Sequence, residues 1–106
     1  MRLISKRTAL TRFMRQWDWL AEHPLCVEHE WPGWEKYGVV TLWCWACEYG
    51  EKHDLECDNC LLIGLWPREC MHPSSPYVKW ARATKPITRK KYALEIANYC
   101  RNLLKA

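Results

Sequence analysis

Two pairs of closely spaced cysteines constrain this chain more than any other feature. Cys44 and Cys47 form one Cys-x2-Cys pair, Cys57 and Cys60 form a second, and residues 48–56 separate the pairs. Each pair places two sulfur atoms on one side of a tight turn, and two pairs supply the four thiolates of a tetrahedral site. Thiolates are soft ligands, which favour zinc or iron over magnesium or calcium. The pattern predicts one zinc ion held by these four cysteines. A closed shell of four protein ligands makes such a site structural rather than catalytic.

Three alternatives to zinc remain open at the level of the sequence. The four cysteines could hold an iron–sulfur cluster, could form disulfides, or could include a redox-active pair, which needs only one Cys-x2-Cys at the start of a helix. Cys70 and His72 follow closely, and either could join or replace a ligand at the metal. His53 lies between the pairs and could hydrogen-bond to a ligand. Cys100 falls on the apolar face of a predicted helix and is interpreted as a core thiol.

The length of the chain and its number of cysteines limit the possible architecture and the cellular compartment. The chain has 106 residues, which predicts a single domain over residues 1–106. Such a small core is expected to need a staple, and the odd number of seven cysteines would leave one thiol outside a closed set of disulfides. Residues 1–16 mix basic and apolar side chains without the continuous apolar run of a secretory signal, and the chain has no run long enough to span a membrane. We therefore expect reduced thiols, a bound metal and a cytoplasmic protein without membrane contact.

The formal charge of +4 conceals an uneven distribution along the chain. Both ends are basic, whereas residues 18–58 are strongly acidic. A protein that binds nucleic acid usually has a basic stripe with few acids nearby, so this distribution weakens a general nucleic-acid argument. The acidic middle could instead dock on a basic groove of another protein, where complementary charge speeds encounter. It consists of Glu28, Glu30, Glu35, Glu48, Glu51, Asp54, Glu56 and Asp58. A solvated acidic face, or one that offsets the basic helices of the same molecule, is the simpler explanation.

Apolar residues at spacings of three and four predict two main helices, over residues 5–22 and 86–105. Ser5 is the expected N-cap of the first helix, and Pro24 is expected to end it. We expect the two helices to pack against each other through one apolar stripe on each. The stripes are Leu10, Phe13, Met14 and Trp17 on the first helix, and Tyr92, Ile96, Tyr99, Cys100 and Leu103 on the second.

The region between these helices is predicted to contain shorter elements. Residues 39–43 are rich in β-branched and aromatic side chains and predict a short strand leading into the first cysteine pair. Pro32 and Gly33 predict a turn, and Ser75 followed by Pro76 predicts a short helix with Tyr77, Trp80 and Ala81 facing inward. The expected fold is mainly α with a small β element, in which two amphipathic helices pack on a zinc-knuckle or ribbon-like loop. Trp43, Trp45, Leu62 and Trp66 are expected to attach that loop to the core.

Several runs of the sequence resemble a family of small, cysteine-rich bacteriophage proteins that is largely uncharacterised. The similarity covers most of the chain from about residue 8 and is carried by residues 44–49, 57–62, 31–35 and the segment from Tyr77 to Ile96. The resemblance implies a zinc site, a phage origin and a site of action in the cytoplasm of an infected bacterium, and it supplies no catalytic residues. The family tends to have proline after its fourth cysteine, where this chain has Leu61. The family pattern also favours Cys70 as a recurring fifth cysteine.

No motif of an enzyme is found. His29 is followed by Glu30 and Trp31 rather than by the His-x-Glu and Pro-Cys-x-x-Cys of a zinc deaminase, and the His-Glu-x-x-His of a metalloprotease is absent. There is no phosphate-binding glycine loop and no nucleophile elbow. The sequence therefore predicts a protein without catalytic activity.

Three non-catalytic roles are compatible with the sequence. As in other small phage proteins without catalytic motifs, the protein could bind and modulate a host protein, for example a nuclease or another defence component. It could instead bind nucleic acid through its basic terminal helices, or act as a partner within a phage complex. Trp31, Trp34 and Trp45 are candidate interface anchors only because tryptophan is enriched at binding hot spots.

Overall fold

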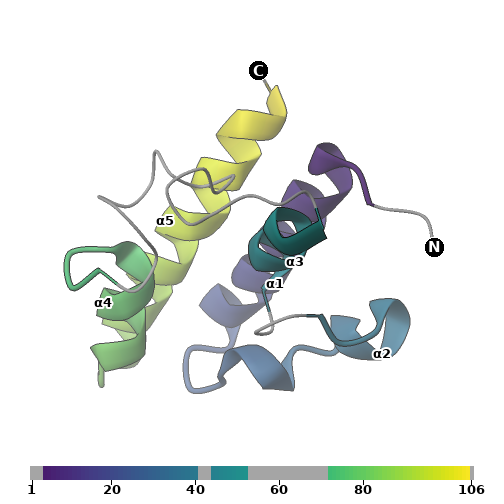
Figure 1. Cartoon of the computed structure of the whole chain (residues 1–106). Coiled ribbons are helices and arrows are strands. Elements are labelled where there is room, and N and C mark those ends of the chain that lie inside the picture. The colour runs from purple at the N-terminus through teal and green to yellow at the C-terminus, as the bar shows by residue number, and fades with distance from the viewer. Residues whose placement is uncertain (1–3, 41–43, 53–71, 106) are drawn as a thin grey trace.

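The computed structural model describes residues 4–40, 44–52 and 72–105, and every regular element in these ranges is helical (Figure 1). The prediction of a small β element is therefore wrong for the described part of the chain. Val39 and Val40 have no regular secondary structure, and residues 41–43 lie outside the described residues. The elements are α1 (Lys6–Glu22), the 3-10 helix η1 (Glu28–Glu30), α2 (Gly33–Tyr37), α3 (Trp45–Lys52), α4 (Pro76–Arg82) and α5 (Pro86–Lys105).

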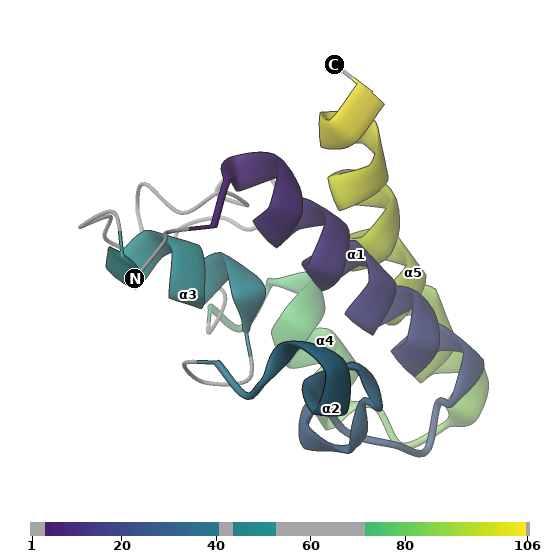
Figure 2. The same cartoon turned by 90° about the vertical axis from the view of Figure 1, so that its right-hand side faces the viewer.

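The two long predicted helices are confirmed as α1 and α5, which run antiparallel and pack together (Figures 1 and 2). The Ser5 hydroxyl accepts a hydrogen bond from the backbone N–H of Thr8 at 3.0 Å, which satisfies one of the unpaired donors at the start of α1. Where the helices meet, α5 contributes Ile96 and Cys100, both completely buried, together with two alanines that allow close approach of the backbones. Cys100 is the core thiol that its helical position predicts.

Helix α4 covers the junction of α1 and α5 with aromatic side chains. Ser75 caps it, as predicted, by accepting the N–H of Val78 at 3.2 Å. The ring of Trp80 meets the ring of Trp17 edge-on, with the ring centres 4.8 Å apart. The inward face of α4 differs from the prediction in one position, because Val78 is buried and Ala81 is exposed. Helix α4 begins at Pro76, and its buried face consists of Pro76, Val78 and Trp80, so Ala81 lies on the opposite, exposed face.

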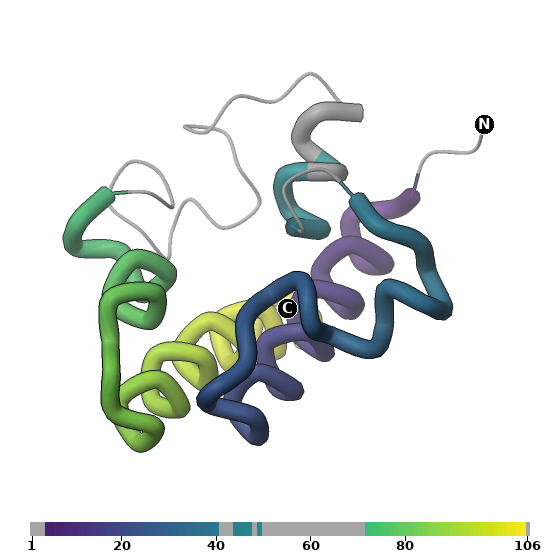
Figure 3. Tube along the Cα trace, turned by 90° about the horizontal axis from the view of Figure 1, so that it is seen from below, coloured from purple at the N-terminus to yellow at the C-terminus, as the bar shows by residue number. Residues whose placement is uncertain are grey.

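Helices α2 and α3 lie on the side of α1 away from α4 (Figure 3). The segment from Trp45 that was expected as part of a knuckle or ribbon-like loop is an α-helix, which corrects the second part of the fold prediction. It forms a helix because Trp45, Ala46 and Tyr49 recur at helical spacing, and the first two are buried.

The turn predicted at Pro32 and Gly33 is instead the start of α2. Pro32 precedes the first helical residue, where a missing N–H costs nothing. The indole ring of Trp31 lies directly over Gly33, so that a Cβ atom at this position would clash with the ring. The helix ends at Gly38, whose φ of 83° is accessible to glycine without strain.

Candidate metal centre

The first cysteine pair lies at the start of α3. Cys44 immediately precedes the helix, and its Sγ accepts a hydrogen bond from the backbone N–H of Cys47 at 3.2 Å. The sulfur thus occupies the place that a serine or aspartate oxygen takes at a capped helix. A helix N-terminus and an N–H···S bond both stabilise the thiolate over the thiol. Both side chains are half-buried; Cys44 lies just before α3, and Cys47 lies in its first turn.

This arrangement fits the donor set of a structural zinc site as far as it is described. Cys44 and Cys47 supply two soft sulfur donors three residues apart at the start of one helix. The second pair, Cys57 and Cys60, lies outside the described residues, as do His53 and Cys70. Within the residues that are described, no three histidine, cysteine or acidic side chains gather as a metal site would require. The four-cysteine site therefore remains a prediction, of which the structure presents two members.

His72, which could join or replace a ligand, is hydrogen-bonded within the fold. Its Nδ1 accepts the backbone N–H of Ser74 at 3.1 Å. Binding a metal through Nδ1 would break this hydrogen bond, so a role for His72 at the metal stays a prediction.

Aromatic and cationic side chains attach α3 to α1 and α2. The ring of Trp45 stacks on Trp34 with centres 6.0 Å apart and meets Tyr37 edge-on at 6.0 Å. The guanidinium of Arg12 lies 4.6 Å from the centre of the Trp45 ring and 4.2 Å from that of Tyr37. Trp45 therefore anchors the first cysteine pair to the core, as predicted, while the other expected anchors Trp43, Leu62 and Trp66 lie outside the described residues.

Tyr37 is surrounded by positive charge. Its hydroxyl accepts a hydrogen bond from Arg15 at 3.3 Å, and the Lys36 ammonium lies 5.3 Å from its ring centre. Desolvation by burial raises the pKa of the Tyr37 phenol. The hydrogen bond from Arg15 and the charge and hydrogen bond of Lys36 lower it by more, so the net pKa lies below its ordinary value. This cluster holds α2 on α1 and brings no nucleophile or general base to the cysteines.

The three tryptophans suggested as interface anchors belong to the core. Trp31 and Trp34 are each 7% exposed, Trp45 is 2% exposed, and the rings of Trp31 and Trp34 pack edge-on at 5.0 Å. The Trp34 indole N–H also donates to the backbone carbonyl of Glu28 at 2.9 Å. Packing rather than binding explains these side chains.

Part of the acidic middle is used within the fold. A carboxylate oxygen of Glu28 accepts the Tyr77 hydroxyl at 2.6 Å, which joins η1 to α4. A carboxylate oxygen of Glu30 accepts the backbone N–H of Val27 at 2.9 Å. Glu35 is exposed. The remaining members of the acidic set have side chains outside the described part of the chain. The acidic docking surface is therefore smaller than the sequence suggested, by at least these two carboxylates.

Sequence reasoning missed Arg89, whose guanidinium joins several parts of the chain. Its guanidinium donates to the carbonyls of Pro24 at 2.5 Å and Cys26 at 3.0 Å, and to that of Trp80 at 3.2 Å. It also lies 4.2 Å from the centre of the Trp80 ring. This one side chain ties the connection after α1 to the end of α4 and the start of α5.

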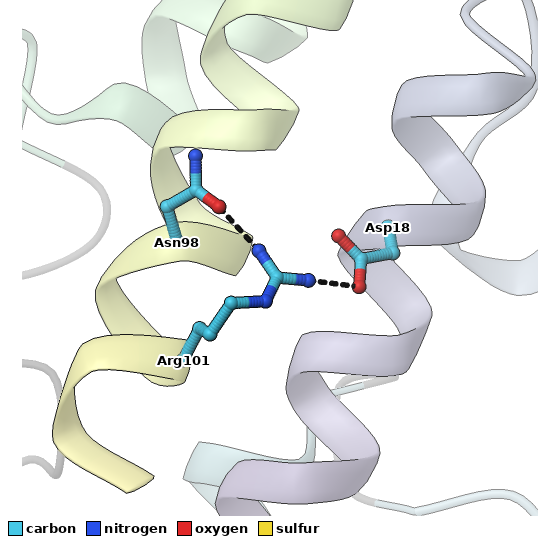
Figure 4. Close-up of polar contacts among 3 residues, drawn as sticks. All are labelled: Asp18, Asn98 and Arg101. Carbon is cyan, nitrogen blue, oxygen red and sulfur yellow. Dashed lines mark hydrogen bonds and ion pairs between the residues drawn. The ribbon is translucent and has the colours of Figure 1, made fainter. Parts of the chain in front are cut away.

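A second polar tie lies on the seam between α1 and α5. Figure 4 shows Arg101 between Asp18 and Asn98, with its guanidinium 2.6 Å from a carboxylate oxygen of Asp18. Both charged side chains are more than a third exposed, so solvent weakens the pair. The three residues form an exposed polar contact between α1 and α5.

Compared with models of protein families, with curated proteins and with solved structures, the chain matches none of them. None of the described helices is both long enough and apolar enough to cross a membrane.

Proposed function

We propose that this is a non-catalytic, zinc-stapled protein of a bacteriophage that acts in the bacterial cytoplasm by binding and modulating a host protein. Cys44, Cys47, Cys57 and Cys60 hold the metal, which, when bound, supplies a cross-link between the start of α3 and the chain that follows it. The support for the metal is the capped, thiolate-favouring geometry of the first pair. Zinc in this role fixes a shape and takes no part in a reaction.

The observation that carries the binding role is a pair of aliphatic side chains in solvent. Leu25 and Ile87 are each 78% exposed, whereas most large apolar side chains in the described residues are buried or partly buried in the core. The hydrogen bonds of Arg89 to the carbonyls on either side of Leu25 hold that loop against the start of α5, where Ile87 lies. Figures 2 and 3 show the loop after α1 and the α4–α5 connection at the same end of the molecule. Neighbouring exposed apolar side chains on a rigid base are typical of protein-binding surfaces.

The test is capture of a host protein by tagged protein in a bacterial lysate treated with nuclease. We expect the native chain to retain a host protein. The double variant Leu25→Asp, Ile87→Asp should retain no more than about one tenth of that amount. An acid in the first turn of α5 complements the helix dipole, so Ile87→Asp should not harm the fold. Val39→Asp is the matched control, because Val39 is also exposed, at 61%, and lies elsewhere in the sequence. Equal retention by the double variant and the control would contradict the proposed surface.

A further inference from the structure

Basic side chains gather on α4, the α4–α5 connection and the first turns of α5. Five of them are exposed, and they fall within thirteen consecutive residues, counted from Lys79 to Lys91. The ammonium groups of Lys79 from α4 and Lys91 from α5 lie 5.9 Å and 5.4 Å from the ring centre of the same residue, Tyr92. The cations of the two helices therefore converge in space as well as in sequence. We call this set the α4–α5 basic surface; it consists of Lys79, Arg82, Lys85, Lys90 and Lys91.

Within the described ranges, no ion pair neutralises this surface. Residues 72–94 contain no aspartate or glutamate, and the ion pair found in the described residues, Asp18 with Arg101, involves none of the five cations. Two acids lie near its edges. Glu28 accepts the Tyr77 hydroxyl, and Glu95 is exposed one turn beyond Lys91, with no ion pair between Glu95 and Lys91 among the described contacts. The first turn of α5 also carries no acid, so the positive end of the helix dipole adds to the same field.

The surface is also held rigid. Arg89 donates to the carbonyls of Trp80 and Ala83 near the end of α4, at 3.2 Å and 3.5 Å, and stacks on the Trp80 ring. Arg89 is the sixth cation of this segment, and unlike the other five it contacts the fold itself, where it holds the connection between α4 and α5. The five outward cations are therefore presented at set positions, which lowers the conformational cost of binding an extended anion.

From this arrangement we infer that the α4–α5 basic surface binds the phosphodiester backbone of nucleic acid, an activity separate from the proposed contact with a host protein. Four of the five cations are lysines, a residue that is depleted at protein–protein interfaces but is, with arginine, the standard contact to nucleic-acid phosphates. The short connection Ala83–Lys85 joins the two helices, so the cations of α4 and α5 are close in the fold. The lack of acids removes the repulsion that would otherwise oppose a phosphate chain.

The experiment measures affinity for a 20-base-pair DNA duplex, the matching single strand and the same sequence as RNA, by fluorescence anisotropy at several salt concentrations. Each phosphate neutralised on a duplex contributes about −0.9 to the slope of log K against log salt. Five contacts predict a slope of about −4.5 with the native chain. The triple variant Arg82→Gln, Lys85→Gln, Lys90→Gln should reduce the magnitude of this slope by about 2 to 3 and weaken binding at least about tenfold at 0.1 M salt.

The matched control is Lys6→Gln, Lys36→Gln, Lys105→Gln, which removes the same charge from exposed positions outside the surface. We expect this control to keep the native slope to within about one. Thermal unfolding followed by circular dichroism establishes that both triple variants are folded. The inference is overturned if the two triple variants lose affinity equally. It is also overturned if no nucleic acid binds at low salt, or if vesicles of anionic phospholipid bind more tightly than every nucleic acid with the same dependence on the three residues. None of these outcomes bears on the host-protein contact, which is measured after nuclease treatment through Leu25 and Ile87.

Discussion

Helix α1 has two sides that are held in different ways. On the side of α5, a helix of 20 residues places Ala93, Ile96, Ala97 and Cys100 completely out of solvent. On the side of α3, a helix of 8 residues is attached by the rings of Trp34, Tyr37 and Trp45 and the guanidinium of Arg12. Isolated helices shorter than about 12 residues are marginal in water, so α3 depends on what holds its ends. The first side is stabilised by aliphatic burial, and we expect the second to need the metal as well.

The largest expected effect is therefore on α3 and not on α5. Replacing Cys47 with serine exchanges one of the four soft thiolate ligands for a hydroxyl, which binds zinc poorly. Binding of structural zinc contributes about 10–16 kcal/mol to the folding free energy of small modules. We expect loss of the bound zinc by native mass spectrometry and unfolding of at least residues 39–73. Hydrogen exchange should show loss of amide protection in α3, while residues 93–100 of α5 keep theirs.

Cys26→Ser is the control for this prediction, because Cys26 is a half-buried thiol outside both cysteine pairs. It should keep the zinc and the protection of α3. If Cys47→Ser retained the native metal content and melting temperature, the four cysteines would be misassigned. If it instead unfolded α5 together with α3, the two sides of α1 would form one cooperative unit and the contrast between them would be wrong.

A smaller effect is expected at Arg89, which belongs to the metal-independent side. Arg89→Met keeps most of the aliphatic side chain but leaves the carbonyls of Pro24, Cys26 and Trp80 without their charged donor. We expect a loss of about 2–4 kcal/mol in the free energy of unfolding, measured by urea denaturation. The loss should be the same with and without a zinc chelator, because the contacts of Arg89 lie on the connection after α1, α4 and α5.

Lys90→Met is the matched control, since Lys90 is exposed on the next position of the same helix. A surface substitution of this kind should change stability by less than about 0.5 kcal/mol. Similar losses for the two variants would show that the guanidinium contacts contribute nothing beyond helix propensity. A loss at Arg89 that disappeared when zinc is removed would place it on the α3 side.

The sequence predicted the parts of the fold that depend on regular local patterns. The caps at Ser5 and Ser75, the two long helices and their pairing are confirmed, because each rests on helical periodicity or on a hydroxyl at a defined position. The predicted strand at residues 39–43 and the ribbon-like loop were wrong for the described residues, because a short run of β-branched and aromatic side chains does not reveal which tertiary contacts it will make. Trp45 and Ala46 form a helix because they pack on α1, which only the assembled core shows.

Some residues of the candidate site and of the proposed binding surface were predictable from the sequence, and others were not. Spacing alone identified the cysteines, and the structure adds that Cys44 caps α3 through its sulfur. Nothing in the local sequence distinguishes Arg89, which bonds to carbonyls far away in the chain, from Lys90, which is exposed. Exposure of Leu25 and Ile87 is likewise a property of the whole fold, since both residues would have been assigned to a core by hydropathy alone.

The smallest expected effect concerns the ion pair between Asp18 and Arg101, which tests whether charge contributes to the α1–α5 seam at all. Both side chains are more than a third exposed, so Asp18→Asn should cost only about 0.2–1 kcal/mol at low salt. The cost should vanish near 1 M salt, where screening extends over about 3 Å. Urea denaturation of Asp18→Asn, Arg101→Gln and the double variant gives the coupling energy directly. A coupling well above 1 kcal/mol that persists in high salt would mean that the α1–α5 side also relies on a polar clamp. The two sides of α1 would then differ in degree rather than in kind.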